Sequence, residues 1–216
     1  MNNATKELII TGNIGTGKST VTKIFEERGY KIISADEISA AILKENHKEI
    51  SKMFSMLPQK FNSFKKRLSN MVFSKQCTLV NYKEELEKFM VPKIQEEIEH
   101  KKLALSMAGR KYVIEMPTYF ETRGLKKDNE SLVIMVQADK DIRLKRIMER
   151  NKHLSIQDVL NRMRTQIQPS EKVQYCDEII WNNGTYEELK NETLRVKRII
   201  ENEYSYPMKE YHKSSK

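Results

Sequence analysis

The sequence predicts an α/β fold in which a five-stranded parallel sheet lies between two layers of helices. Short apolar runs typical of buried strands alternate with segments of helical periodicity. The first apolar run leads into a glycine-rich stretch that a helix follows, and a lysine-rich helical region separates the second strand from the third. The 216 residues are enough for one such domain with a modest insertion.

The first two strand–helix pairs occupy the start of the chain. The apolar triplet Leu8-Ile9-Ile10 predicts a buried strand over residues 6–11, and residues 21–28 predict a helix that stops at Gly29. A second strand is expected over residues 30–35, with a helix over residues 37–43 after it. Because helices join successive strands, we expect the strands to be parallel.

The stretch between the first strand and its helix fits the phosphate-binding pattern G-x-x-x-x-G-K-S/T. Glycines allow backbone N–H groups to curl around phosphate oxygens, and the helix N-terminus adds partial positive charge. Lys18 can reach the β- and γ-phosphates, and the Ser19 hydroxyl can ligate Mg²⁺. The alternative is a glycine-rich turn with a chance lysine. The predicted nucleotide-binding residues are Gly12, Asn13, Ile14, Gly15, Thr16, Gly17, Lys18, Ser19 and Thr20.

Residues 47–108 differ in character, because they are rich in lysine, poor in glycine and apolar at helical spacing. We interpret them as a helical insertion that holds the second substrate. Residues 1–46 and 109–203 then form the nucleotide-binding core. Pro92 interrupts the longest periodic pattern, so a helix should start or kink there.

Three further strands are expected over residues 112–116, 132–136 and 178–182. Helices over residues 139–151 and 155–166 and a last helix ending near residue 203 complete the core. Two of these helices begin with capping signals, Ser155 with Asp158 and Thr185 with Glu188. Residues 204–216 are polar without periodicity, and we expect a flexible tail.

Ligands of open parallel sheets bind beyond the carboxyl ends of the strands, where we expect Asp36 and Glu115 to meet the glycine-rich loop. Asp36 can accept the proton of an attacking hydroxyl, although it can also be a helix N-cap. Glu115 can hold Mg²⁺ together with Ser19, or simply make a local hydrogen bond. Glu121 has a similar or weaker case for the metal.

Phosphoryl transfer also needs cations, which the segment around residue 146 supplies. Arg143, Arg146 and Arg150 fall on one helix face, with Arg162 and Arg164 on the next helix. We interpret residues 143–170 as a lid and favour Arg146 and Arg150 as catalytic; the alternative is a solvated basic face.

A polar turn, Asn182-Asn183-Gly184, follows the last predicted strand. It can present backbone groups to a nucleobase, or it can be a simple turn before the last helix. The residues alone leave these alternatives open.

Composition adds little to these motifs. The net charge of +9 suits an acidic partner, but the absence of a long block of lysine and arginine makes nucleic acid unlikely. Cys77 and Cys176 are far apart, the four histidines do not cluster, and no apolar stretch is long enough to span a bilayer. We therefore expect a cytoplasmic protein with reduced thiols, no structural metal and no membrane partner.

Together these residues indicate a P-loop kinase of a small molecule that uses ATP and Mg²⁺. The sequence also resembles the dephospho-coenzyme A kinase family over nearly the whole chain to about residue 200. Residues 11–20 resemble its TGGIGSGKST motif, residues 34–36 its DAD, residues 115–121 its D-x-P-L-L-F-E, and residues 182–184 the end of its AD-x-I-x-NNG. Weaker blocks follow in the same order: R-x-x-L with VF near residues 65–73, QLxRLxxR near 144–150, and R-x-x-x-Q at 162–166.

The resemblance implies that the γ-phosphoryl group of ATP is transferred to the ribose 3′-hydroxyl of dephospho-coenzyme A, with Asp36 as base. This chain departs from the pattern at Ser34, Lys65, Val91 and the Thr118-Tyr119 pair. Most of these departures fall near the presumed acceptor site, so they bear on acceptor affinity more than on the reaction. The Lys65 departure loses bidentate phosphate recognition.

Two alternatives remain at this stage. One is a nucleoside-monophosphate kinase or another small-metabolite kinase with the same core. The other, more remote, is a non-catalytic P-loop protein that binds nucleic acid. A pure binder has no need of a carboxylate at Asp36. The sequence is compatible with a monomer or a small homo-oligomer.

Overall fold

The computed structural model describes residues 6–57, 60–73, 81–152 and 154–203. Its contacts divide the chain into two compact units, one formed by Met1–Ser34 with Lys102–Lys216 and the other by Ala35–Lys101. The expectations for Cys77, for two of the histidines (His153 and His212) and for the tail over residues 204–216 lie outside the described residues.

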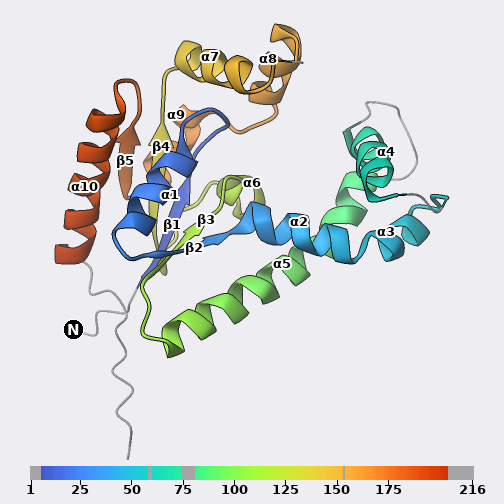
Figure 1. The fold of residues 1–216 in the computed structure, drawn as a ribbon, viewed down its shortest axis with the longest axis horizontal. Coiled ribbons are helices and arrows are strands. Elements are labelled where there is room, and N and C mark those ends of the chain that lie inside the picture. The colour runs from blue at the N-terminus through green and yellow to red at the C-terminus, as the bar shows by residue number, and fades with distance from the viewer. Residues whose placement is uncertain (1–5, 58–59, 74–80, 153, 204–216) are drawn as a thin grey trace, which may run out of the picture. The chain divides into compact units, whose positions relative to one another are not determined.

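The first unit is built on a parallel sheet of five strands, which confirms the predicted fold class (Figure 1). The order is β2-β3-β1-β4-β5, so β1 lies in the middle and pairs with both β3 and β4. The loop that follows β1 therefore leaves the centre of the sheet at its carboxyl edge, where ligands of such sheets bind. The strands are β1 (Glu7–Thr11), β2 (Lys31–Ser34), β3 (Tyr112–Glu115), β4 (Ser131–Gln137) and β5 (Glu178–Trp181).

Helices of this unit connect the strands and cover the sheet. The first begins at Lys18 rather than in the twenties, so Lys18 and Ser19 lie in its first turn. Two short helices were not expected from periodicity, because four or five residues are too few to show it. The helices are α1 (Lys18–Glu27), α6 (Tyr119–Arg123), α7 (Lys140–Arg150), α8 (Ile156–Arg164), α9 (Pro169–Lys172), the 3₁₀ helix η1 (Val173–Tyr175) and α10 (Tyr186–Glu203).

Continuous apolar strands are buried on both faces of the sheet. On one face, Phe25 of α1 and Val196 of α10 pack with Leu8 and Ile10 of β1 in the main core, and Figure 1 shows α1 and α10 side by side there. Ile9 points the other way along the strand and is also buried. All seven residues of β4 are buried. Burial on both faces explains why these strands read as uninterrupted apolar runs.

A smaller apolar cluster joins α7 to α8. Its buried members are Ile147, Val159 and Met163, and Ile14 of the glycine-rich loop packs against them. Ser155 caps α8 through the expected exchange with Asp158. Figure 1 shows both helices at the end of the sheet where β4 leads into α7. The two helices thus share a core of their own that includes the tip of the loop.

The second unit is helical, with a core that includes Ile50, Phe64 and Leu68. It contains α2 (Ala35–Glu45), α3 (His47–Met53), α4 (Phe61–Phe73) and most of α5 (Tyr82–Met107), whose end from Lys102 belongs to the first unit. Pro92 lies inside α5, so no helix starts there, and the alternative that the helix kinks at this residue stays a prediction. Proline removes only one backbone hydrogen bond of the helix, and the hydrogen bonds of the turns on either side keep it continuous. In the described part of the chain, no helix is long and apolar enough to cross a membrane.

Candidate active site

The glycine-rich loop joins β1 to α1 and requires glycine at its narrowest points. Gly12 and Gly17 have φ angles of 146° and 90°, which side chains disfavour. A Cβ on Gly12 would lie 2.4 Å from the Val136 carbonyl oxygen, and one on Gly17 would lie 2.2 Å from Asn182 Nδ2. The loop therefore passes directly against the ends of β4 and β5, which leaves no room for side chains there.

Lys18 lies inside the curve of this loop. Its Nζ donates to the carbonyl oxygens of Gly12 at 2.6 Å and Asn13 at 3.2 Å. The Thr16 hydroxyl donates to the same Asn13 carbonyl at 2.9 Å. A cation, a ring of backbone groups and the N-terminus of α1 thus come together, an arrangement suited to binding phosphates.

Asn182 holds the loop from the end of β5. Its amide Nδ2 donates to the Thr16 carbonyl oxygen at 2.8 Å, and the side chain is buried. Arg146 of α7 donates to the Asn182 carbonyl oxygen at 2.9 Å and to its Oδ1 at 3.2 Å. The sequence-predicted residues Arg146 and Asn182 therefore contact each other, and Asn182 also contacts the loop.

The other arginines of α7 differ in environment. Arg143 is only 5% exposed, and its Nε donates to the Ile14 carbonyl oxygen at 2.9 Å. Burial lowers the pKa of Arg143 from its usual value. Arg150 is exposed at the end of the helix. Arg143 thus supports the loop's backbone, while the predicted catalytic roles of Arg146 and Arg150 stay predictions.

The rest of the turn after β5 is held within the protein. Asn183 Oδ1 accepts the Asp139 backbone N–H at 2.8 Å, at the start of α7. A Cβ on Gly184 would collide with the Glu188 carboxylate, whose Oε2 accepts the Thr185 backbone N–H. These contacts fix the turn's shape, and its contact with a nucleobase stays a prediction.

One predicted magnesium ligand ends the strand next to β1, and the other lies at the start of the helix that follows the loop. Glu115 ends β3 and lies in register with Ile10 of β1 and Ser34 of β2. Ser19 is exposed in the first turn of α1. A carboxylate and a hydroxyl are oxygen ligands of the kind Mg²⁺ prefers. Their chemistry fits the ion, and its binding stays a prediction.

Asp36 belongs to the second unit. Helix α2 begins at Ala35, directly after β2, so Asp36 lies within the first turn and is not its N-cap. Its side chain is exposed, and a carboxylate in this turn is favoured by the helix dipole. A role as base stays a prediction.

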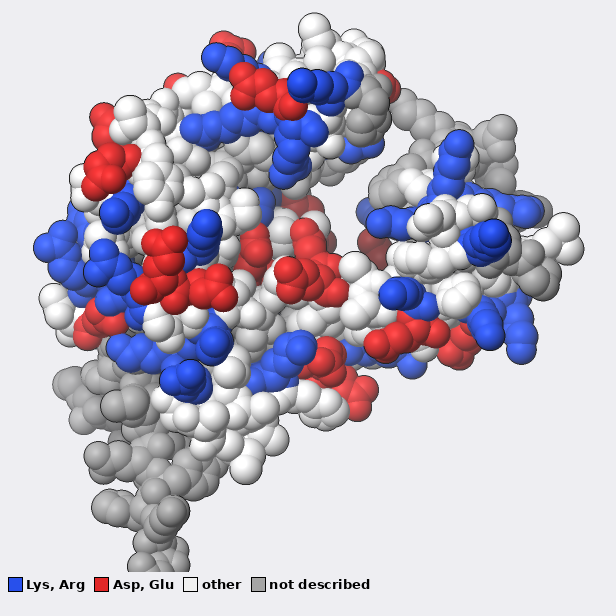
Figure 2. Space-filling view, viewed as in Figure 1, with Lys and Arg blue, Asp and Glu red and all other residues white. Residues whose placement is uncertain are grey.

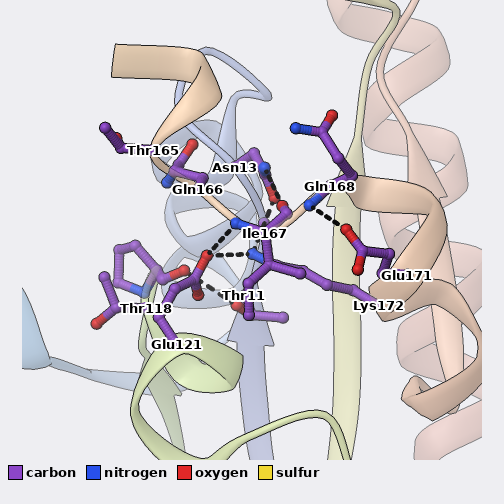
Figure 3. Close-up of polar contacts among 12 residues, drawn as sticks. Thr11, Asn13, Thr118, Glu121, Thr165, Gln166, Ile167, Gln168, Glu171 and Lys172 are labelled. Atoms are coloured by element: carbon purple, nitrogen blue, oxygen red, sulfur yellow. Dashed lines mark hydrogen bonds and ion pairs between the residues drawn. The ribbon is translucent and has the colours of Figure 1, made fainter. Parts of the chain in front are cut away.

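The structure adds Lys172, which the sequence did not single out, and it gives Gln166 a contact with the loop (Figure 3). Lys172 is fully buried and donates to Glu121 Oε1 at 2.7 Å and to Asn13 Oδ1 at 3.1 Å. Gln166 Oε1 accepts the Ile14 N–H at 2.8 Å. Nothing in the polar segment around Lys172 marks a buried lysine, whereas Gln166 ends the R-x-x-x-Q block of the resemblance.

A parallel sheet whose central strand runs into this loop, with two arginine-bearing helices beside it, defines a P-loop kinase. The family model for dephospho-CoA kinase matches residues 8–188. The chain belongs to the dephospho-CoA kinase family, and it is a kinase.

Relatives and solved structures agree with this placement. Dephospho-CoA kinase of Helicobacter pylori (strain J99) is 33% identical over 89% of this chain and 96% of its own, and that of Campylobacter jejuni (strain RM1221) is 34% identical over 87% and 92%. A solved dephospho-CoA kinase from Campylobacter jejuni, 32% identical, superposes with a TM-score of 0.66 over 90% of this chain and 96% of that one. The structure of TT1252 from Thermus thermophilus is 25% identical and superposes with a TM-score of 0.76 over 89% of this chain and 97% of that one.

Proposed function

We propose that this kinase transfers the γ-phosphoryl group of ATP to the ribose 3′-hydroxyl of dephospho-coenzyme A, which yields coenzyme A and ADP. The observation that carries the proposal is the family match over residues 8–188, which spans both the phosphate loop and the helical unit. The Lys18 ammonium, enclosed by the loop's carbonyl groups, supports its donor half.

The proposed roles follow from where charge moves in the reaction. The loop of residues 12–20 binds the ATP phosphates through backbone N–H groups, with Lys18 against the β- and γ-phosphates. Asp36 accepts the proton of the acceptor hydroxyl as its oxygen attacks the phosphorus and the bond to the β-phosphate oxygen breaks. Arg146 and Arg150 balance the negative charge on the transferred group.

Two further sets of residues complete the donor side. Ser19 and Glu115 are the proposed holders of Mg²⁺, which when bound neutralises charge on the β- and γ-phosphates. Asn182, Asn183 and Gly184 are proposed to border the nucleobase. The acceptor is assigned to the helices of residues 47–108, with residues 143–170 as a lid. We place the protein in the cytoplasm, as a monomer or a small homo-oligomer.

Surface charge supports a small-molecule kinase over a nucleic-acid binder. The chain carries a net charge of +9. Figure 2 shows basic and acidic side chains interspersed over the visible face, rather than a basic stripe. A nucleic-acid footprint gathers lysine and arginine on one face or along one helix.

Acceptor-dependent ADP release tests the function. Purified protein with ATP and Mg²⁺ is offered dephospho-coenzyme A or a panel of nucleoside monophosphates, and we expect turnover only with dephospho-coenzyme A. Turnover with a monophosphate alone would assign a different kinase. No turnover with any acceptor, together with nucleic-acid binding, would make the chain a nucleic-acid-binding protein rather than an enzyme.

Lys18→Ala should abolish productive ATP use, and retained activity in that variant would contradict the assignment of residues 12–20 as the phosphate-binding loop.

A further inference from the structure

Four residues form a closed ring of polar contacts behind the phosphate loop (Figure 3). Lys172 Nζ donates to Asn13 Oδ1 at 3.1 Å and to Glu121 Oε1 at 2.7 Å. Asn13 Nδ2 donates to the Ile167 carbonyl oxygen at 3.0 Å, and the Ile167 N–H donates to the same Glu121 oxygen at 3.2 Å. The ring therefore joins the loop, α6, α9 and the segment between α8 and α9.

The ring contains a buried charge, which requires polar partners inside the protein. Lys172 has no exposed surface, Asn13 is 1% exposed and the Glu121 side chain is 21% exposed. A buried charge is tolerated only where a counter-charge and hydrogen-bond acceptors surround it. Lys172 has both, from segments far apart in sequence. Because its ammonium is enclosed, Lys172 does not contact substrate, and its effect on the reaction has to pass through its neighbours.

Asn13 is the neighbour that reaches the site. Its side chain belongs to the ring, while its carbonyl oxygen accepts the Lys18 ammonium and the Thr16 hydroxyl inside the loop. Fixing the Asn13 side chain therefore fixes the backbone that surrounds Lys18. The family motif TGGIGSGKST has glycine at this position, so the two side-chain contacts of Asn13 with the ring are additions of this chain.

We propose that Lys172 is a positioning residue for the phosphate loop. Through Asn13 it holds the loop in the shape that receives ATP phosphates, and through Glu121 and Ile167 it ties that shape to α6 and to the segment that follows α8. The proposal rests on the proposed function in taking ATP as the loop's ligand. It adds a residue, remote from the chemistry, on which ATP affinity depends.

Titration of a non-hydrolysable ATP analogue with Mg²⁺ tests the proposal, alongside steady-state kinetics and thermal unfolding. Lys172→Met keeps the stem and removes the charge, and Asn13→Gly removes the loop's side of the ring. Each should raise the Kd of the analogue and the KM for ATP about 10- to 100-fold, with the KM for dephospho-coenzyme A unchanged. Because both substitutions break the same ring, the double variant should bind the analogue no more weakly than the single variant with the higher Kd.

Lys127→Met is the matched control. Lys127 pairs with the largely buried Asp177 at 2.6 Å in the same unit, away from the loop. It should leave the Kd of the analogue within twofold of the wild type, whatever it does to the unfolding temperature.

A lowered unfolding temperature with unchanged Kd and KM for ATP in Lys172→Met would overturn the proposal, because the residue would then serve stability alone. The proposal would also be overturned if the increase in Kd in the double variant equalled the product of the increases in the two single variants. If Lys172→Met does not fold, Asn13→Gly decides, since unchanged ATP affinity there contradicts the proposed route. A wild-type protein inactive on dephospho-coenzyme A but weakened in analogue binding by Lys172→Met would remove the proposed function and leave this inference standing.

Discussion

Among single residues, Asn182 shows how one side chain can organise several segments. Its amide nitrogen donates to the phosphate loop, while its oxygens accept the Arg146 guanidinium of α7. A buried amide with donor and acceptor both occupied has one favourable orientation. Gly17 is confined against it. The geometry of the donor site is thus set by side-chain amides as well as by glycines.

Replacing Asp36 with asparagine tests the base. Asp36→Asn removes the proton acceptor with little change in size, so turnover should fall by about 10²- to 10⁴-fold. The Kd of an ATP analogue should stay near that of the wild type. Glu37→Gln, at the next position in the same turn, is the matched control and should retain turnover. Near-normal turnover in Asp36→Asn would remove this residue as base.

The Cys176 thiol should resist alkylation in the native protein. Burial, with a smaller effect of the Asp177 charge, raises the pKa of Cys176 to about 12. Only the thiolate reacts, and at pH 8 it is roughly one part in ten thousand of the thiol. Iodoacetamide labelling followed by peptide mass spectrometry should find Cys176 modified quickly only after unfolding. Rapid native labelling would contradict the raised pKa.

At the scale of elements, α7 and α8 have a core separate from the main one. Ile147, Val159 and Met163 form it, whereas α1 and α10 pack into the cluster around Leu8 and Ile10. Elements with few contacts to the main core open more readily than the core itself. Helix α8 is therefore suited to a lid, which has to move while the sheet stays folded, whereas α7 is also tied to Ile14 and Asn182 through Arg143 and Arg146.

Matched cap deletions test this independence. Ser155→Ala removes the hydroxyl that accepts the Asp158 N–H and should destabilise α8 by about 1 kcal/mol. Thr185→Ala removes the corresponding contact with Glu188 at α10. Amide hydrogen exchange should quicken only in α7 and α8 for the first variant, and across the sheet for the second. Equal quickening of α1 in both would show one cooperative core.

For the molecule as a whole, an ion cluster joins the chain's last described helix to the sheet. Glu201 of α10 accepts from Lys197, from Lys111 just before β3 and from the Tyr30 hydroxyl just before β2. Burial opposes ionisation of Glu201, but these hydrogen bonds prevail and lower its pKa to about 2. The cluster lies at the N-terminal ends of the strands, away from the loop.

The stability of the protein should depend on pH through Glu201. A carboxyl with a depressed folded-state pKa stabilises the protein above its unfolded value of about 4.5, and this stabilisation is lost as the pH falls towards 2. Glu201→Gln should cost about 1–2 kcal/mol at pH 7, allowing for solvent screening. Urea unfolding should show this gap at pH 7 and a smaller one near pH 3. An equal gap at both pH values would contradict the assignment.

Features carried by one stretch of the sequence could be predicted, whereas contacts between residues far apart in the sequence could not. All five strands were identifiable, because each contains a short apolar run, which in β1, β3 and β4 reflects burial on both faces. The phosphate loop carries its pattern within nine residues. Helices α6 and α9 were missed because they are shorter than the period that reveals a helix. Lys172 was missed for a different reason. Its burial depends on Glu121 and Asn13, and no pattern along the chain brings these three together.

The phosphate loop is made first and held last. Its pattern ends at Ser19, yet the side chains that hold it from behind are Arg143, Gln166, Lys172 and Asn182. A chain emerging from the ribosome therefore carries the complete motif long before it contains the side chains that hold the loop in shape. The last of these side chains, Asn182, follows β5, so the loop has all four of these supports only once β5 has joined the sheet. We therefore expect chains that end before Asn182 to contain the complete motif and yet bind ATP more weakly than the 216-residue chain.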